Sequence, residues 1–225
     1  MSIAKFRRLG LSALAVVVLA VSVAGCSSPA SLVDTFTGKI TAADFQFSAT
    51  IAGTMHVEVS GMKLDGTFSG TAKLKGKDSA TAMTTSMAGS TSTQESVTVD
   101  GTTYTKGTDG TWTKSAKSDN NDISTFLKSA GGLTDKGIET HNGQQLHRLA
   151  SNAPFDPKMM GLDTAKITDV KVDLVFWAKD DGTPAGMSLS GGWTQDFSGS
   201  KGPVTVTLDY NFDSLSGVTI DAPAA

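Results

Sequence analysis

This chain of 225 residues has little cysteine or histidine, the side chains most used for disulfides, metal sites and acid–base catalysis. It contains one cysteine, Cys26, and three histidines. One cysteine excludes an internal disulfide, and three histidines without a cysteine partner are too few for a structural zinc site. We therefore expect the folded part to be held together by its hydrophobic core alone.

An excess of positive charge is also lacking. Lys and Arg number 19 and Asp and Glu number 22, so the formal net charge at pH 7 is −3. Binding of duplex nucleic acid needs a basic surface, so nucleic acid is not an expected partner. The apolar fraction of 39% is enough for a sizeable core, and the length favours a single domain.

Sequence motifs of catalysis are missing or incomplete. Ser118-Asp119-Asn120 and the Ser-x-x-Lys form of Ser198–Lys201 occur in the reverse of the order typical of penicillin-binding enzymes, and no Lys-Thr-Gly follows. The stretch Gly70–Lys77 has one residue too many for a phosphate-binding loop. We therefore predict that the protein is not an enzyme and that it binds neither a metal ion nor a separate cofactor.

The N-terminus is typical of a secretory signal. Lys5, Arg7 and Arg8 precede the stretch 11–21, which is apolar except for Ser12. A permanent transmembrane helix is the alternative, but it needs about 20 apolar residues and this run is shorter. We therefore predict that residues 1–25 are a signal peptide and that the mature chain is extracytoplasmic.

A lipid anchor is predicted at the end of this signal. Val23-Ala24-Gly25-Cys26 resembles the bacterial lipobox, in which the cysteine thiol carries a diacylglycerol. Cleavage before Cys26 removes three basic and no acidic residues, so the net charge becomes −6 and the acyl chains must hold the protein at an anionic membrane. We predict a lipidated tether over residues 26–31, a single domain over 32–225, and a location on the outer face of the bacterial cell membrane.

Alternating apolar and polar residues predict antiparallel strands. The pattern is clearest over 204–212 and 170–178, and it recurs at 187–189, 45–51, 55–59 and 97–104. Asp-Gly-Thr occurs four times, starting at Asp65, Asp100, Asp109 and Asp181, and Asn142-Gly143 is a fifth candidate for a tight turn. We expect all five to connect strands, whereas the Ser- and Thr-rich stretch 79–96 fits either a weak edge strand or a loop.

Three segments favour short helices: 123–130, with Asp122 as the N-cap, 32–40, and part of 154–162. Combined with the strands, they predict an α+β fold. His141 and His147 flank the Asn142-Gly143 turn and Arg148 follows, so these residues form either a solvated hairpin or a polar cluster. A hydrolase that depends on His141 or His147 is the third-ranked hypothesis for the function.

The order of segments resembles the LolA-like bacterial lipoprotein carriers, and in particular the LppX/LprG type. The features that carry the resemblance are the lipobox, an early helix, long strands, Val97–Lys106 followed by Trp112, the helix with Phe126-Leu127, Gly137–Leu149 and the closing Val218–Pro223. The resemblance implies a large curved antiparallel sheet, an incomplete barrel, with a few short helices over its concave face. It also implies a monomeric, membrane-anchored carrier that transfers lipid or glycolipid across the envelope, with a membrane exporter as a further partner.

On this interpretation the apolar sides of the strands and of one helix line a pocket for acyl chains. The predicted lining comprises Phe47, Ile51, Val57, Phe126, Leu127, Leu174, Phe176, Met187 and Leu189. Composition alone leaves open a second sheet that closes an ordinary sandwich core. A second functional hypothesis is a surface lipoprotein that binds a protein partner through Val175 and Trp177, without a lipid ligand.

Overall fold

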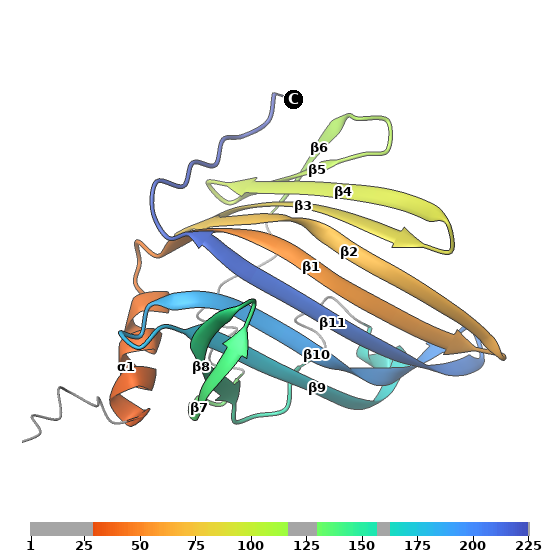
Figure 1. The fold of residues 1–225 in the computed structure, drawn as a ribbon. Coiled ribbons are helices and arrows are strands. Elements are labelled where there is room, and N and C mark those ends of the chain that lie inside the picture. Colours follow the sequence, from red (N-terminus) through yellow and green to blue (C-terminus); the bar gives the residue numbers. More distant parts are fainter. Residues whose placement is uncertain (1–28, 117–129, 157–162, 225) are drawn as a thin grey trace, which may run out of the picture.

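The computed structural model describes residues 29–116, 130–156 and 163–224 (Figure 1). Its first element is the helix α1 (Pro29–Ile40), as the spacing of Leu32, Phe36 and Ile40 predicts. These three side chains are buried on one face of α1. The helix begins at Pro29, a residue favoured at the first helical position, so the last residues of the predicted tether 26–31 belong to its first turn.

Eleven strands form one antiparallel sheet in the order β6-β5-β4-β3-β2-β1-β11-β10-β9-β8-β7. Their bounds are β1 (Gln46–Val59), β2 (Met62–Lys75), β3 (Asp78–Met87), β4 (Ser90–Val99), β5 (Thr102–Lys106), β6 (Trp112–Ala116), β7 (Leu133–His141), β8 (Gln144–Ser151), β9 (Ile167–Ala178), β10 (Pro184–Phe197) and β11 (Ser200–Ser214). The two apolar stretches predicted at 45–51 and 55–59 are thus one strand. Within the described residues, β6 and β7 each pair with one neighbour, so the sheet is open.

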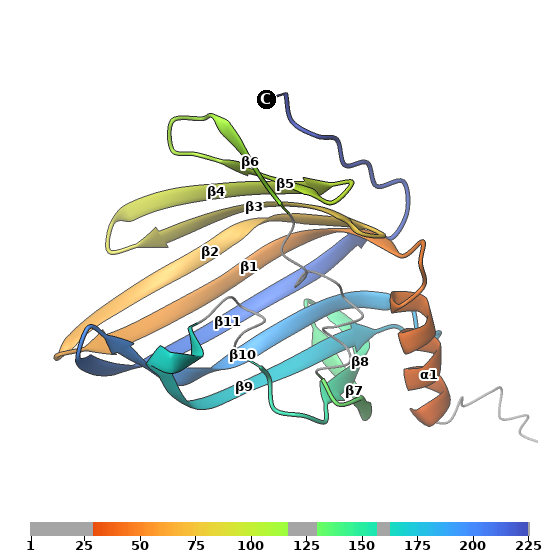
Figure 2. The same ribbon diagram turned by 180° about the vertical axis from the view of Figure 1, so that it is seen from behind.

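The sheet consists of two meanders joined by one pairing of distant strands. Strands β1 to β6 follow one another in space as in sequence, and so do β7 to β11. The two halves meet where β1 pairs with β11, in a register that runs from Ser48↔Ser214 to Val57↔Val204. The views from both sides show the long strands β1, β2, β10 and β11 at the centre of the sheet, with α1 at one end of it (Figure 2).

The two faces of this sheet differ in chemistry. We call the face that α1 covers the inner face; on β1 it carries Phe47, Ala49, Ile51 and Val57, all of which are buried. The opposite, outer face carries polar residues of the same strands, and Thr205 and Thr207 are exposed there as the alternation predicts. Directly paired residues lie on the same face, so the register assigns the residues of all eleven strands to one face or the other.

Four of the five predicted turns connect strands in the structure. Asp100-Gly101, Asp109-Gly110, Asn142-Gly143 and Asp181-Gly182 each lie between two strands, and each of these glycines has a positive φ. The prediction for Asp65-Gly66 was wrong, because both residues lie inside β2 opposite His56 and Met55. The β1–β2 turn lies instead at Ser60-Gly61, where both residues have a positive φ.

The stretch 79–96 is a hairpin of β3 and β4 with its turn at Ala88-Gly89.

The prediction of a large open antiparallel sheet is confirmed. The expected set of helices over the concave face is not confirmed, since α1 and the 3₁₀ turn η2 (Thr164–Lys166) are the helical elements of the described residues. The predicted helix at 123–130, except Ala130, and most of the one at 154–162 lie outside those residues.

Gly53 offers a test of the β1–β11 pairing. A Cβ atom on Gly53 would lie 2.3 Å from the Thr207 carbonyl oxygen, which is a backbone atom. We expect Gly53→Ala to lower the free energy of unfolding by about 1–3 kcal/mol through overpacking. Gly38→Ala in α1 is the control: nothing lies within 4 Å of its Cβ position, and we expect it to raise that free energy by about 0.5–1 kcal/mol. If urea unfolding shows the same change in the free energy of unfolding for Gly53→Ala and Gly38→Ala, this account of the β1–β11 pairing is wrong.

Candidate functional site

All the predicted pocket residues that the structure describes lie on the inner face. Ile51, Leu174 and Phe176 are buried, with relative exposures of 1%, 3% and 0%. Phe47, Val57 and Leu189 are also buried, while Met187 is half-buried. Cys26, Phe126 and Leu127 lie outside the described residues. The register thus brings together on one face seven residues that are up to 142 positions apart in the sequence.

The apolar part of the inner face is continuous. One cluster of buried residues extends over α1, β8 to β11 and Val57 of β1 and includes Ala130 and Phe155 from outside the strands, and a second one lies on β1 and β2. Phe45 and Leu208 are half-buried and pack against both clusters. In the second cluster Phe47 stacks on Phe212 with 4.5 Å between ring centroids. The described members of that cluster come from the sheet, from Phe45 just before β1 and from Leu215 just after β11, and α1 contributes none of them.

Helix α1 is fixed to the sheet through the turn between β9 and β10. The Phe36 and Phe176 rings are 5.5 Å apart at their centroids. The Lys39 ammonium donates to the Asp181 carbonyl oxygen and to Thr183 Oγ1, both at 2.9 Å. One apolar and two polar contacts therefore set the position of the helix at this end of the inner face.

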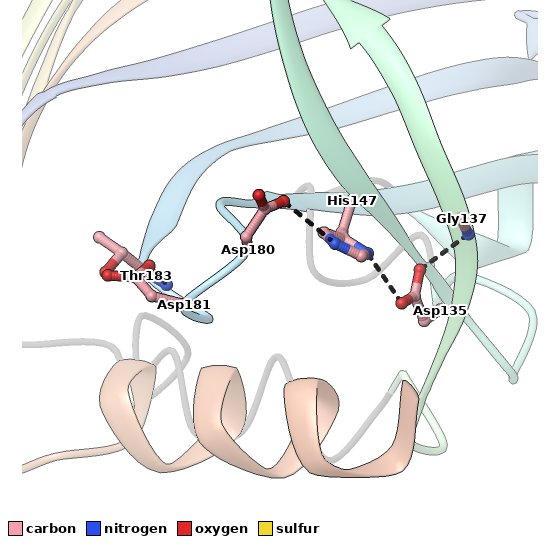
Figure 3. Close-up of polar contacts among 6 residues, drawn as sticks. All are labelled: Asp135, Gly137, His147, Asp180, Asp181 and Thr183. Atoms are coloured by element: carbon pink, nitrogen blue, oxygen red, sulfur yellow. Dashed lines mark hydrogen bonds and ion pairs between the residues drawn. The ribbon is translucent and has the colours of Figure 1, made fainter. Parts of the chain in front are cut away.

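His147 connects the same turn to β7, as Figure 3 shows. Its Nδ1 lies 2.9 Å from Asp135 Oδ2, and its Nε2 lies 3.4 Å from Asp180 Oδ1. Asp135 Oδ1 also accepts a hydrogen bond from the Gly137 backbone NH at 2.8 Å. Both imidazole nitrogens of His147 contact carboxylates, so this side chain links β7 to the β9–β10 turn. It is not positioned to act as a base for a nucleophile.

His141 lies on the outer face and stacks on Trp177, with 4.1 Å between ring centroids. Trp177 Nε1 donates to Ser188 Oγ at 2.6 Å, and Ser188 Oγ donates to Asp209 Oδ1 at 2.5 Å. A serine activated for acyl transfer would instead donate to the histidine. The geometry of both histidines therefore gives the hydrolase hypothesis no support.

The hypothesis of a protein contact through Val175 and Trp177 was wrong about their exposure. Their relative exposures are 5% and 7%, and they form a small buried cluster with Leu146. The β7–β8 hairpin supplies both Leu146 and the His141 ring that covers Trp177. These apolar side chains on the outer face are therefore covered within the chain.

The inner face changes character from β3 to β6, a feature that the sequence did not reveal. The residues that the register places there are Ser79, Thr81, Met83, Thr85 and Met87 on β3, Ser90, Ser92, Gln94, Ser96 and Thr98 on β4, Thr103 and Thr105 on β5, and Thr113 and Ser115 on β6. None of them is charged; the charged residues of these strands, such as Glu95 and Lys106, lie on the outer face. A hydroxyl-rich surface thus adjoins the apolar one.

Two cavities in the described structure lie away from most of the predicted lining. One of about 440 Å³ crosses the outer face between a row with Thr54 and Thr207 and a row with His56 and Thr205. The other, of about 390 Å³, lies where β8 and β9 separate beyond Ala150, and Leu174 is the predicted residue in its lining. Among the described residues, no three potential metal ligands gather, and no helix is long and apolar enough to cross a membrane.

Neither a protein-family model nor a curated protein matches the chain. Several solved structures do. LprF from Mycobacterium bovis has 14% sequence identity and a TM-score of 0.43, over 88% of this chain and 99% of that one. A LolA superfamily protein from Nitrosomonas europaea has 9% identity and a TM-score of 0.28, over 84% and 95%. MucB in its complex with MucA has 15% identity and a TM-score of 0.29, over 84% and 57%. The solved structures to which the chain is similar thus include LprF and a LolA superfamily protein.

The stacking of His141 predicts a pH effect. Burial holds the pKa of His141 below its ordinary value of 6.5, and the Asp209 carboxylate partly offsets this. The unfolded chain therefore binds the proton more readily, so this residue's contribution to stability is complete above pH 6.5 and declines as the pH falls toward the lowered pKa. In an NMR titration we expect a midpoint below 6.5 for His141 and a lower one in Asp209→Asn. A midpoint at or above 6.5 in the unchanged protein would contradict this account.

Proposed function

We propose that this protein is a membrane-anchored lipoprotein that binds the acyl chains of a lipid on its inner face and carries that lipid across the cell envelope. The observation that carries the proposal is the continuous apolar surface of the inner face, on which α1 packs against the first of the two clusters and contributes no residue to the second. His141 and His147 are each engaged in contacts within the chain, and Val175 and Trp177 are buried, so the two alternative functions lack the support that the continuous apolar surface gives to lipid binding.

The acyl chains would bind by removal of apolar surface from water. Each methylene group contributes about 0.8 kcal/mol when it is buried, and binding needs large side chains without unpaired polar atoms. Phe45, Met55, Phe68, Met187 and Leu208 fit this need, because they are half-buried residues on the inner face that pack against the buried cluster. Methionine adapts its shape to chains of different length and saturation.

The hydroxyl-rich part of the inner face indicates the head group. Serine and threonine hydroxyls both donate and accept hydrogen bonds, which suits the hydroxyl groups of a sugar. A phosphate or carboxylate would call for lysine or arginine, and the register places neither on the inner face of β3 to β6. We therefore propose a glycolipid with an uncharged head group, whose chains lie on β1, β2 and β8 to β11.

The anchor in this proposal is a diacylglycerol on Cys26, after removal of residues 1–25. Pro29 begins α1, so the acylated residue would lie three positions before the helix. A short tether of this kind keeps α1, and the end of the inner face that it covers, close to the membrane that holds the anchor. The carrier acts as a monomer in this proposal and receives its lipid from the membrane or from an exporter in it.

Leu208 and Thr207 allow a matched test, because they are neighbours on β11 that face opposite sides of the sheet. We expect Leu208→Gln to weaken the binding of a fluorescent fatty acyl probe about tenfold or more, since it places an amide among the acyl chains. Thr207→Gln, on the exposed outer face, should leave the affinity unchanged. Probe fluorescence measures the affinity, and thermal melts of both variants show whether they remain folded.

A folded Leu208→Gln variant that binds the probe as well as the unchanged protein would contradict the proposed site. Absence of probe binding and of bound cellular lipid in the unchanged protein would contradict the proposed function as a whole.

A further inference from the structure

Two of the large apolar side chains that are strongly exposed in the described structure lie beside hairpin turns. Met62 is 60% exposed and follows the β1–β2 turn at Ser60-Gly61. Phe197 is 38% exposed and precedes the β10–β11 turn at Ser198-Gly199. The two residues are not needed for the turns, whose positive φ angles are taken by Ser60, Gly61, Ser198 and Gly199.

These two turns lie side by side. β1 pairs with β11 up to Val57↔Val204, next to the two turns. Gly202 lies so close to β1 that a Cβ atom on it would overlap the Glu58 carbonyl oxygen. Figures 1 and 2 show both hairpins at the end of the sheet opposite α1. We call Met62 and Phe197 with their two turns the apolar rim.

The apolar rim is continuous with the inner face. Met62 has the same alternation phase on β2 as Leu64 and Phe68, which pack against the buried cluster. Phe197 pairs with Ser200 in the register that pairs Trp193 with Val204, so it shares the phase of Trp193 and Leu189. An apolar track therefore runs along β2 from the inner face out to Met62, while on β10 Gln195 shares this phase and lies between Trp193 and Phe197.

Charge at the rim is close to balanced. Lys63 Nζ lies 3.8 Å from Glu58 Oε2. Lys201 is directly opposite Asp196, whose Oδ1 accepts a hydrogen bond from the Gly199 NH at 2.6 Å. A surface of this kind has no net positive charge to attract anionic head groups, and its attraction to a bilayer would come from apolar burial.

We propose that the apolar rim, which lies at the end of the sheet opposite the anchored helix α1, inserts into the surface of a second bilayer, so that acyl chains pass between that bilayer and the inner face without crossing water. A bilayer suits the rim better than a protein partner does, because two separate apolar side chains beside adjacent turns fit between lipid head groups and the apolar track behind Met62 continues the hydrocarbon. The transfer step rests on the proposed lipid function, whereas insertion of the rim stands on the exposed residues alone. Because insertion is apolar, it should occur on uncharged phosphatidylcholine and resist salt.

Insertion is tested by adding phosphatidylcholine vesicles to the chain with Cys26→Ser, which carries no anchor, and with an environment-sensitive fluorophore on Phe197→Cys. Ile138→Cys is the matched control, since Ile138 is 55% exposed but lies on β7, away from the rim. We expect a blue shift of the emission at position 197 in vesicles relative to detergent-free monomer, and none at position 138. Equal emission at the two positions in vesicles would overturn the proposal, and quenching of position 197 by an added protein would then indicate a protein partner.

Transfer is tested in the double variant Met62→Ser, Phe197→Ser. We expect its uptake of a fluorescent acyl probe from phosphatidylcholine vesicles to be about tenfold slower, while its final occupancy is unchanged. Ile138→Ser should take up the probe at the rate of the unchanged protein. An unchanged rate in the double variant would overturn the role of the rim in transfer. If the unchanged protein binds no acyl probe at all, the proposed lipid function is overturned, and the fluorophore experiment alone then decides whether the rim inserts.

Discussion

The pairing of β1 with β11 is the constraint on which the rest of the structure depends. It joins two meanders that are each built from neighbours in sequence, and it aligns Ile51 with Tyr210 and Val57 with Val204. A slip of one residue would turn every inner residue of one half to the outer face. The continuous inner face, its change from apolar to hydroxyl-rich side chains, and the neighbouring turns of the apolar rim all follow from this register. Gly53 and Gly202 permit the close approach that it requires.

The strands with an apolar residue at every second position could be predicted from the sequence, because one of their sides faces the core. Val204 to Phe212 and Val170 to Ala178 are examples, and α1 followed from the spacing of its buried residues. Stretch 79–96 could not be decided, since serine and threonine on both sides give no alternation. Asp65-Gly66 misled because a turn dipeptide inside a strand looks the same in sequence, and only the pairing with Met55 and Met87 distinguishes it.

The candidate site was predictable in kind and not in layout. The inner position of Leu174, Phe176 and Leu189 follows from alternation alone. The burial of Val175 and Trp177 on the other face does not, because it depends on the β7–β8 hairpin folding back over β9. Likewise, the sequence alone did not show that the hydroxyl groups of β3 to β6 lie on the same surface as Phe47 and Ala72, because this depends on the register of the strands.

The central claim is that this surface holds a lipid, and native mass spectrometry of the full-length protein purified from lipid-containing cells tests it most directly. The account predicts a population heavier than the polypeptide with its covalent acyl groups, which releases on activation a neutral lipid bearing a sugar head group. A single mass that matches the acylated polypeptide, with no lipid released, would contradict the account.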